Sequence, residues 1–183
     1  MWILRPVGEP FSPEVKEAFK RYPKRGNYVI GLFRVFANSL RLLNKGFVNL
    51  LDKESPLSIM EREIIILRVS ANNNCEYEWG VHVSAFAEYA KLSAEQVKAT
   101  VVHDHEATCW NERQGLLIQS IDELCDKGRI QAETLDRFRK TWDLEQQLEI
   151  LTLAGSYHTI AFIANSAELP LEEFATRFPR QSA

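Results

Sequence analysis

Three residues in the stretch 74–82 carry side chains of the kinds that enzymes use in catalysis. Cys75, Glu78 and His82 stand at positions i, i+3 and i+7 of a segment that we expect to be helical. This spacing places a thiol, a carboxylate and an imidazole on one helix face. Glu63, in the preceding segment, adds a second carboxylate. We predict that these four residues form the catalytic site.

Each of the four residues can be given a role. Cys75 is expected in the first turn of its helix, where the dipole and free N–H groups lower the pKa of a thiol. His82, two turns further along, can exchange a proton with the thiol, and Glu63 can orient His82. Glu78 works against this scheme unless it is protonated or paired, because a carboxylate beside a thiol opposes its ionisation.

Several neighbouring residues are candidates for the pocket wall or the core. Tyr77, Trp79 and Phe86 flank His82 on a largely apolar segment. A lone histidine there would more often be a hydrogen-bonded core residue. Because it stands with three other ionisable or reactive groups, a functional pocket is favoured. His158, in the last long helical segment, either lines this pocket or is a core histidine.

Metal binding is the less favoured interpretation. Glu63, Glu78, His82 and His158 offer the nitrogen and oxygen ligands that zinc or iron accept. The sequence contains no HExxH spacing and no paired CxxC motif to support a metal centre. It therefore predicts neither a metal nor another cofactor.

Helical periodicity dominates the sequence and strand patterns are lacking, so we predict an all-α fold. Pairs of capping residues, Ser58 with Glu61 and Asp143 with Gln146 among them, mark helix starts, and Gly128 marks a helix end. The expected helices span residues 12–22, 27–51, 58–71, 75–89, 93–102, 111–127, 131–140 and 143–164.

Length and composition are those of one soluble domain. The 183 residues are 45% hydrophobic and 26% charged. We divide the domain into an N-terminal helical extension (1–55), the helices that carry the candidate site (56–102) and the C-terminal helices (103–183). The net charge of −3 and the lack of a basic stripe argue against nucleic acid as a partner. No apolar run could span a membrane, and no signal peptide is evident, so we expect a cytoplasmic protein.

The four catalytic candidates resemble the signature of the carboxymuconolactone decarboxylase / alkylhydroperoxidase D superfamily. The resemblance is strongest over residues 57–97, and residues 148–171 are similar to the last helix of longer members. It implies an α-helical bundle that assembles into homo-oligomers, commonly trimers or hexamers, and acts on a small-molecule substrate.

One position departs from the alkylhydroperoxidase pattern. In that family the helix carries Cys-x-x-Cys, then three residues and His, and the second cysteine attacks the peroxide; Glu78 replaces that cysteine here. An intrahelical disulfide cannot form, so peroxidase chemistry would require Cys75 as the attacking thiolate. Cys109, a partner subunit or an external thiol reductant would then resolve the oxidised sulfur.

The decarboxylase branch of the superfamily offers a different comparison. There, a glutamate stands four residues before the matching histidine, as Glu78 does before His82. Such a pair suits proton transfer at a lactone or enol. The sequence thus favours a peroxidase-type oxidoreductase using Cys75, His82 and Glu63. Acid–base lyase chemistry on a small carboxylated lactone, or a non-catalytic oligomer with a decayed site, remain as alternatives.

Overall fold

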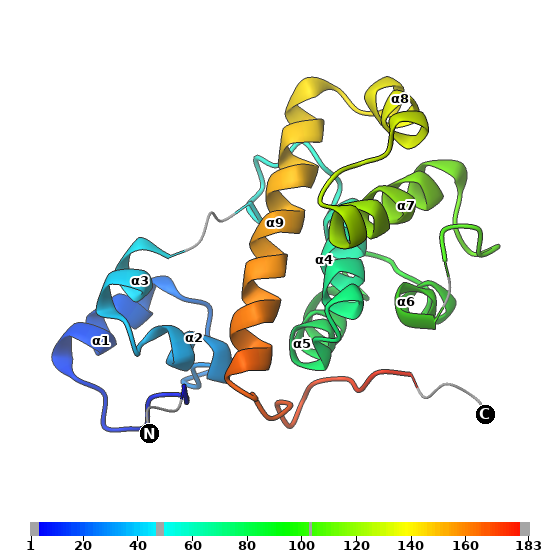
Figure 1. The fold of residues 1–183 in the computed structure, drawn as a ribbon. Coiled ribbons are helices and arrows are strands. Elements are labelled where there is room, and N and C mark those ends of the chain that lie inside the picture. The colour runs from blue at the N-terminus through cyan, green and yellow to red at the C-terminus, as the bar shows by residue number, and fades with distance from the viewer. Residues whose placement is uncertain (1–3, 47–49, 103, 180–183) are drawn as a thin grey trace.

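The computed structural model describes residues 4–46, 50–102 and 104–179 (Figure 1). Within these residues all regular elements are helices, which confirms the predicted all-α fold. In chain order the elements are α1 (Pro13–Ala18), the 3-10 helix η1 (Phe19–Arg21), α2 (Gly31–Phe36), α3 (Leu40–Lys45), α4 (Ile59–Asn72), α5 (Glu76–Phe86), α6 (Ala94–Val102), α7 (Glu112–Lys127), α8 (Ala132–Thr141) and α9 (Leu144–Ser166).

Helix α4 is the centre of the bundle. It contacts α5, α6, α7 and α9, and the run Ile64 to Leu67 is fully buried. Four consecutive residues of a helix point in different directions around its axis, so their burial shows that other elements enclose α4 on every side. The main apolar core therefore surrounds α4, and the few polar side chains that α4 carries inward are held in the protein interior.

Capping chemistry sets most helix boundaries, as the sequence predicts. Ser58 and Glu61 form a capping box at the start of α4, and Asp143 and Gln146 form another at the start of α9. Gly128 ends α7 in the left-handed conformation. These side chains satisfy N–H groups that the first turn of a helix leaves free, and a glycine accepts positive φ at no steric cost.

The N-terminal extension differs from the expectation. The single helix predicted over residues 27–51 is wrong: the structure has two short helices, α2 and α3, separated at residues 37–39. Ser39 adopts an extended conformation and its hydroxyl accepts the N–H of Leu42, which starts α3 anew. The apolar spacing continues across the break because α2 and α3 contribute to the same secondary core, which also includes residues of α1, α5 and α9.

The C-terminal segment after α9 runs beneath α5, as Figure 1 shows at the bottom of the view. The N–H of Thr176 donates to the carbonyl of Gly80 at 3.2 Å, and that of Phe178 donates to a Glu76 oxygen at 2.8 Å. Phe178 also packs against Trp79, with ring centroids 5.2 Å apart. We call this segment, residues 167–179, the C-terminal strap; its contacts hold α5 against the bundle.

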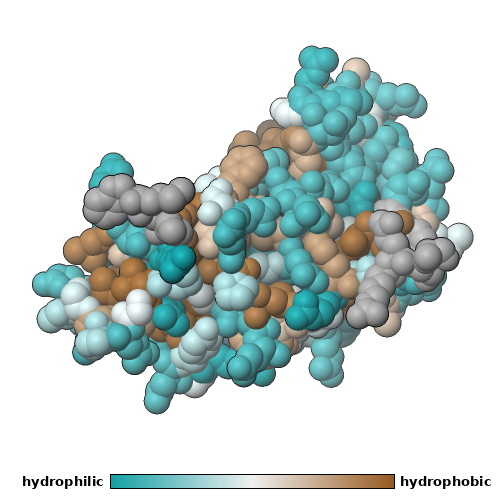
Figure 2. All heavy atoms as spheres, turned by 60° about the horizontal axis from the view of Figure 1, so that its bottom comes forward, coloured by the Kyte–Doolittle hydropathy of each residue, from teal (hydrophilic) through white to brown (hydrophobic). Residues whose placement is uncertain are grey.

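The surface is mixed in character. Figure 2 shows apolar patches gathered over the side of the N-terminal helices, with hydrophilic residues over much of the remainder. No helix in the described part of the chain has the length and hydropathy needed to cross a membrane. The homo-oligomer implied by the sequence resemblance stays a prediction.

Gly80 is required for the close approach of the strap. A Cβ added there would lie 2.2 Å from the carbonyl oxygen of Thr176, whereas one added at Gly155, in α9, would meet nothing within 4 Å. We expect Gly80→Ala to displace the strap and lower the free energy of unfolding by about 1–3 kcal/mol. The matched variant Gly155→Ala should raise it by up to about 1 kcal/mol through helix propensity. Urea unfolding of both variants measures the difference, and equal stabilities would contradict this role.

Candidate active site

The candidate site is built around His82, which is 5% exposed on the inner face of α5. Its Nδ1 lies 2.9 Å from a carboxylate oxygen of Glu63, on α4. Its Nε2 lies 3.3 Å from Oε1 of Glu78, one turn back on α5, and 3.1 Å from the hydroxyl of Tyr157, on α9. Three helices thus converge on one imidazole.

The two carboxylates decide the charge of His82. Burial by itself lowers the pKa of the imidazole, but the charge and hydrogen bond of Glu63, and then those of Glu78, raise it from 6.5 to about 10. His82 is therefore an imidazolium at neutral pH and donates from both ring nitrogens. Because the folded pKa is the higher one, this interaction stabilises the fold fully below about pH 6.5. The contribution is lost as the pH rises through about 10.

Glu78 is the member of this cluster with an unpaired oxygen. Only 4% of the residue is exposed, and Oε1 faces His82. The other oxygen, Oε2, has no hydrogen-bond partner among the described residues. Leaving a buried carboxylate oxygen unpaired costs free energy, so such an atom commonly marks a functional position. Glu78 lines the adjacent cavity, so its side chain can interact with a ligand bound there.

Tyr157 is the third side chain that contacts the imidazole of His82. Burial, then the charges of Glu78 and Glu63, raise the pKa of its phenol well above the ordinary value, so it stays neutral. Since the imidazolium N–H donates to the Tyr157 oxygen, the phenolic O–H is available to donate elsewhere. Tyr157 lines the adjacent cavity. It can therefore offer a hydrogen bond to a ligand oxygen there.

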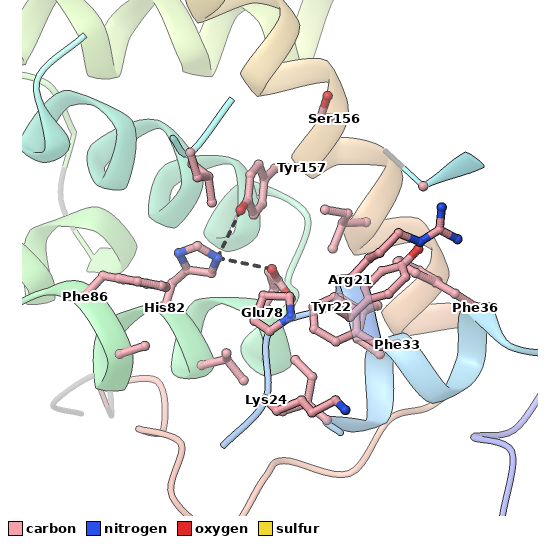
Figure 3. Close-up of a pocket in the computed structure, with 18 of the residues that line it drawn as sticks. Arg21, Tyr22, Lys24, Phe33, Phe36, Glu78, His82, Phe86, Ser156 and Tyr157 are labelled. Atoms are coloured by element: carbon pink, nitrogen blue, oxygen red, sulfur yellow. Dashed lines mark hydrogen bonds and ion pairs between the residues drawn. The ribbon is translucent and has the colours of Figure 1, made fainter. Parts of the chain in front are cut away.

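The cavity has a volume of about 670 Å³ and lies between the N-terminal extension and helices α5 and α9. Figure 3 shows His82, Glu78 and Tyr157 on one side of it and Arg21, Tyr22 and Phe33 on another. Its wall is mainly apolar. This combination of apolar walls with a few converging polar groups is typical of small-molecule sites.

Cys75 lies apart from this arrangement. It is the residue that caps α5, with φ −97° and ψ 79°, so it is not helical and the spacing i to i+7 does not place it beside His82. Its side chain is fully buried in the secondary core and does not line the cavity. The lowered pKa expected for its thiol is wrong: burial raises the pKa to about 11, and the Glu78 charge adds to the increase, against nearby backbone N–H groups.

The four secondary candidates have different surroundings. Phe86 lines the cavity and packs on His82, with centroids 5.2 Å apart. Trp79 is in the main core, where its indole N–H donates to Thr100. Tyr77 faces the N-terminal extension, and its hydroxyl accepts the N–H of Leu32. His158 packs edge-on against the exposed Phe162 and is not in the cavity wall.

Sequence reasoning missed Tyr157 and the wall contributed by residues 21–46, 50 and 51. The signal for Tyr157 is the helical phase of α9: it shares the buried side with Leu153 and Ala161, whereas His158 is rotated away from that side. No local pattern marks the wall residues of the extension, because they approach the site only through tertiary packing.

The fold and site define an all-α, alkylhydroperoxidase D-like protein with a buried carboxylate–histidine–carboxylate cluster. The structure is similar to a solved one described as an uncharacterized peroxidase-related protein from Silicibacter sp. TM1040. The TM-score is 0.77 at 19% sequence identity, and the match covers 96% of each chain.

The family comparison agrees with the fold. The model of the carboxymuconolactone decarboxylase family matches residues 41–117, which include Glu63, Glu78 and His82. No curated protein matches the chain significantly. Residues 41–117 thus match the carboxymuconolactone decarboxylase family, in agreement with the resemblance that the sequence indicated.

The charge state of His82 can be measured directly. NMR of ¹⁵N-labelled histidine should show His82 as an imidazolium at about pH 8, where an ordinary histidine is neutral. Glu63→Gln removes the larger favourable charge and should lower the His82 pKa more than Glu78→Gln does. Glu88→Gln, an exposed carboxylate beyond α5, is the control. A neutral imidazole at pH 8 in the unaltered protein would refute the assignment.

Proposed function

We propose that this protein catalyses acid–base proton transfer on a small organic substrate. The specific reaction that we propose is decarboxylation of a carboxylated lactone. The observation that carries the proposal is the unpartnered Oε2 of Glu78, in a carboxylate that also contacts an imidazolium and lines a cavity. The Glu78 carboxylate lies beside the His82 imidazolium, so the pair can give a proton to a substrate and be reprotonated from solvent.

Each site residue has its own role in this decarboxylation. In decarboxylation the bond between the carboxylate carbon and the ring breaks, CO₂ leaves, and the electron pair passes into the lactone carbonyl as an enolate. One proton then adds to the ring carbon from the Glu78–His82 pair, and solvent replaces it. Tyr157 donates a hydrogen bond to the enolate oxygen, where charge develops. Glu63 keeps His82 oriented and protonated.

Peroxidase chemistry through Cys75 is the second candidate. The description of the Silicibacter protein as peroxidase-related is the observation that favours it. A thiolate is the attacking species in such chemistry. The fully buried, high-pKa thiol of Cys75 opposes it, and so does the lack of contact with the cavity. The acid–base candidate is therefore preferred.

Turnover of carboxylated lactones should depend on Glu78. A panel of such lactones is incubated with the protein in D₂O, and mass spectrometry measures CO₂ loss and deuterium on the product carbon. Glu78→Gln keeps the shape of the side chain but removes the carboxylate that relays the proton to the ring carbon, so the rate should fall about 10²- to 10⁴-fold. Cys75→Ser and Glu88→Gln should retain the rate of the unaltered protein. Failure of the unaltered protein to turn over any lactone would contradict the proposal.

The cysteine itself can be tested by intact-mass analysis. The native protein is exposed briefly to cumene hydroperoxide with a sulfenic-acid trap, and peptide mapping locates any adduct. We expect Cys75 to stay unmodified, because reaction requires an accessible thiolate. The same treatment after unfolding in urea should modify it, which provides the positive control. Rapid stoichiometric oxidation of native Cys75, lost in Cys75→Ser, would instead establish the peroxidase candidate.

A further inference from the structure

Four cationic side chains belong to the wall of the cavity: Arg21, Lys24, Arg25 and Lys45. All four are exposed, whereas Glu78, His82 and Tyr157 are buried. The cations therefore lie where the cavity opens to solvent, opposite the reactive cluster. Figure 3 shows Arg21 and Lys24 on the side of the cavity away from His82. We call these four residues the cation rim.

No carboxylate balances the cation rim within the described residues. None of its members forms an ion pair there, and Glu78 is the single acidic residue in the cavity wall. Two members are held by uncharged groups instead. Arg21 donates to the side-chain oxygen of Asn44 at 2.6 Å, and the guanidinium of Arg25 lies 4.1 Å from the ring centroid of Phe174. These contacts restrain the cations without neutralising them.

The wall between the cation rim and the buried cluster is apolar. It is contributed by the N-terminal extension on one side and by α5, α9 and the C-terminal segment on the other. Its members are Ile30, Leu32, Phe33, Phe36, Leu43, Val81, Leu153, Ile160 and Phe174. A ligand that fills this space must have an apolar body, because polar groups would lose their hydration without gaining partners.

Charge fixes the orientation of such a ligand. An anionic group is repelled by the buried Glu78 carboxylate and attracted by the cation rim, so it must point outward. The opposite end of the ligand then lies beside Glu78, whose Oε2 has no hydrogen-bond partner among the described residues. The anionic group that binds at the rim is therefore not the group that reacts, so a lactone that loses CO₂ beside Glu78 and the His82 imidazolium must carry a second carboxylate.

We propose that the cavity takes an organic carboxylate with an extended apolar body, bound through its carboxylate at the cation rim and reacting at its far end beside Glu78. The inference rests on the proposed function for the identity of the reacting end. In addition, it assigns the selection of the substrate to the N-terminal extension, which carries the cation rim.

Binding of three probes of equal chain length tests the proposal without turnover. Isothermal titration calorimetry compares decanoate, decanol and decylammonium with the full chain. We expect decanoate to bind most tightly and decylammonium least tightly. The double variant Arg21→Gln, Lys24→Gln should weaken decanoate about three- to twentyfold, from the usual contribution of exposed charge pairs, and leave decanol unchanged.

Two further variants locate the effect. Lys20→Gln removes a charge from the same 3-10 helix, but Lys20 pairs with Glu17 and does not line the cavity, so decanoate affinity should not change. Ala85→Trp places bulk at an exposed position of the wall and should weaken decanoate and decanol alike.

Equal affinities for decanoate and decanol, an equal loss in Lys20→Gln, or no binding of decanoate would each overturn the inference. These outcomes are independent of the proposed function, because none of the rim or control variants touches Glu78, His82 or Tyr157. Selective binding of decanoate together with a silent Glu78→Gln would retain the inference and reject the acid–base reaction.

Discussion

The ion pair between Glu63 and His82 is the interaction on which the site depends. It joins α4 to α5 at a point where both side chains are almost fully buried. Removing one partner of such a pair leaves a buried charge uncompensated and commonly costs about 3–5 kcal/mol. The pair is tolerated in the interior because Glu78 and Tyr157 occupy the other side of the imidazole. The contacts that compensate the burial of this ion pair also define the geometry of the candidate site.

The site combines two sources of structure. The buried cluster comes from the central bundle, within helices whose core surrounds α4. The opposite wall comes from short helices that pack on α5 and α9 through the secondary core. The hydroxyl of Tyr77 links these parts, because it accepts the N–H of Leu32 and donates to Glu172, which also accepts the N–H of Gly31. This network explains why Tyr77 is buried without belonging to the cavity.

Local chemistry made much of the fold predictable. Capping boxes and helix periodicity act over a few residues, so α4, α7 and α9 follow from the sequence alone. The association of Glu63, Glu78 and His82 was also predictable from spacing and resemblance. The position of Cys75 was not, because a capping residue leaves the helical conformation and its side chain need not follow the helix face. Tyr157 joins His82 from 75 positions away, which only the packing of α9 on α5 determines.

The cavity is built from two segments that are distant in the sequence, and this has a consequence for how the protein can diversify. Substitutions in the loops and short helices of residues 21–46 reshape the binding wall without altering the buried charges of α4 and α5. The four residues of the cation rim are exposed, so replacing them costs little stability, whereas the wall residues Leu32, Phe36 and Leu43 are buried in the secondary core. Glu63, Glu78 and His82 lie in the interior, where substitutions commonly cost more stability. The architecture thus separates a changeable recognition surface from a fixed chemical centre, which makes the extension the natural place to graft a new ligand preference.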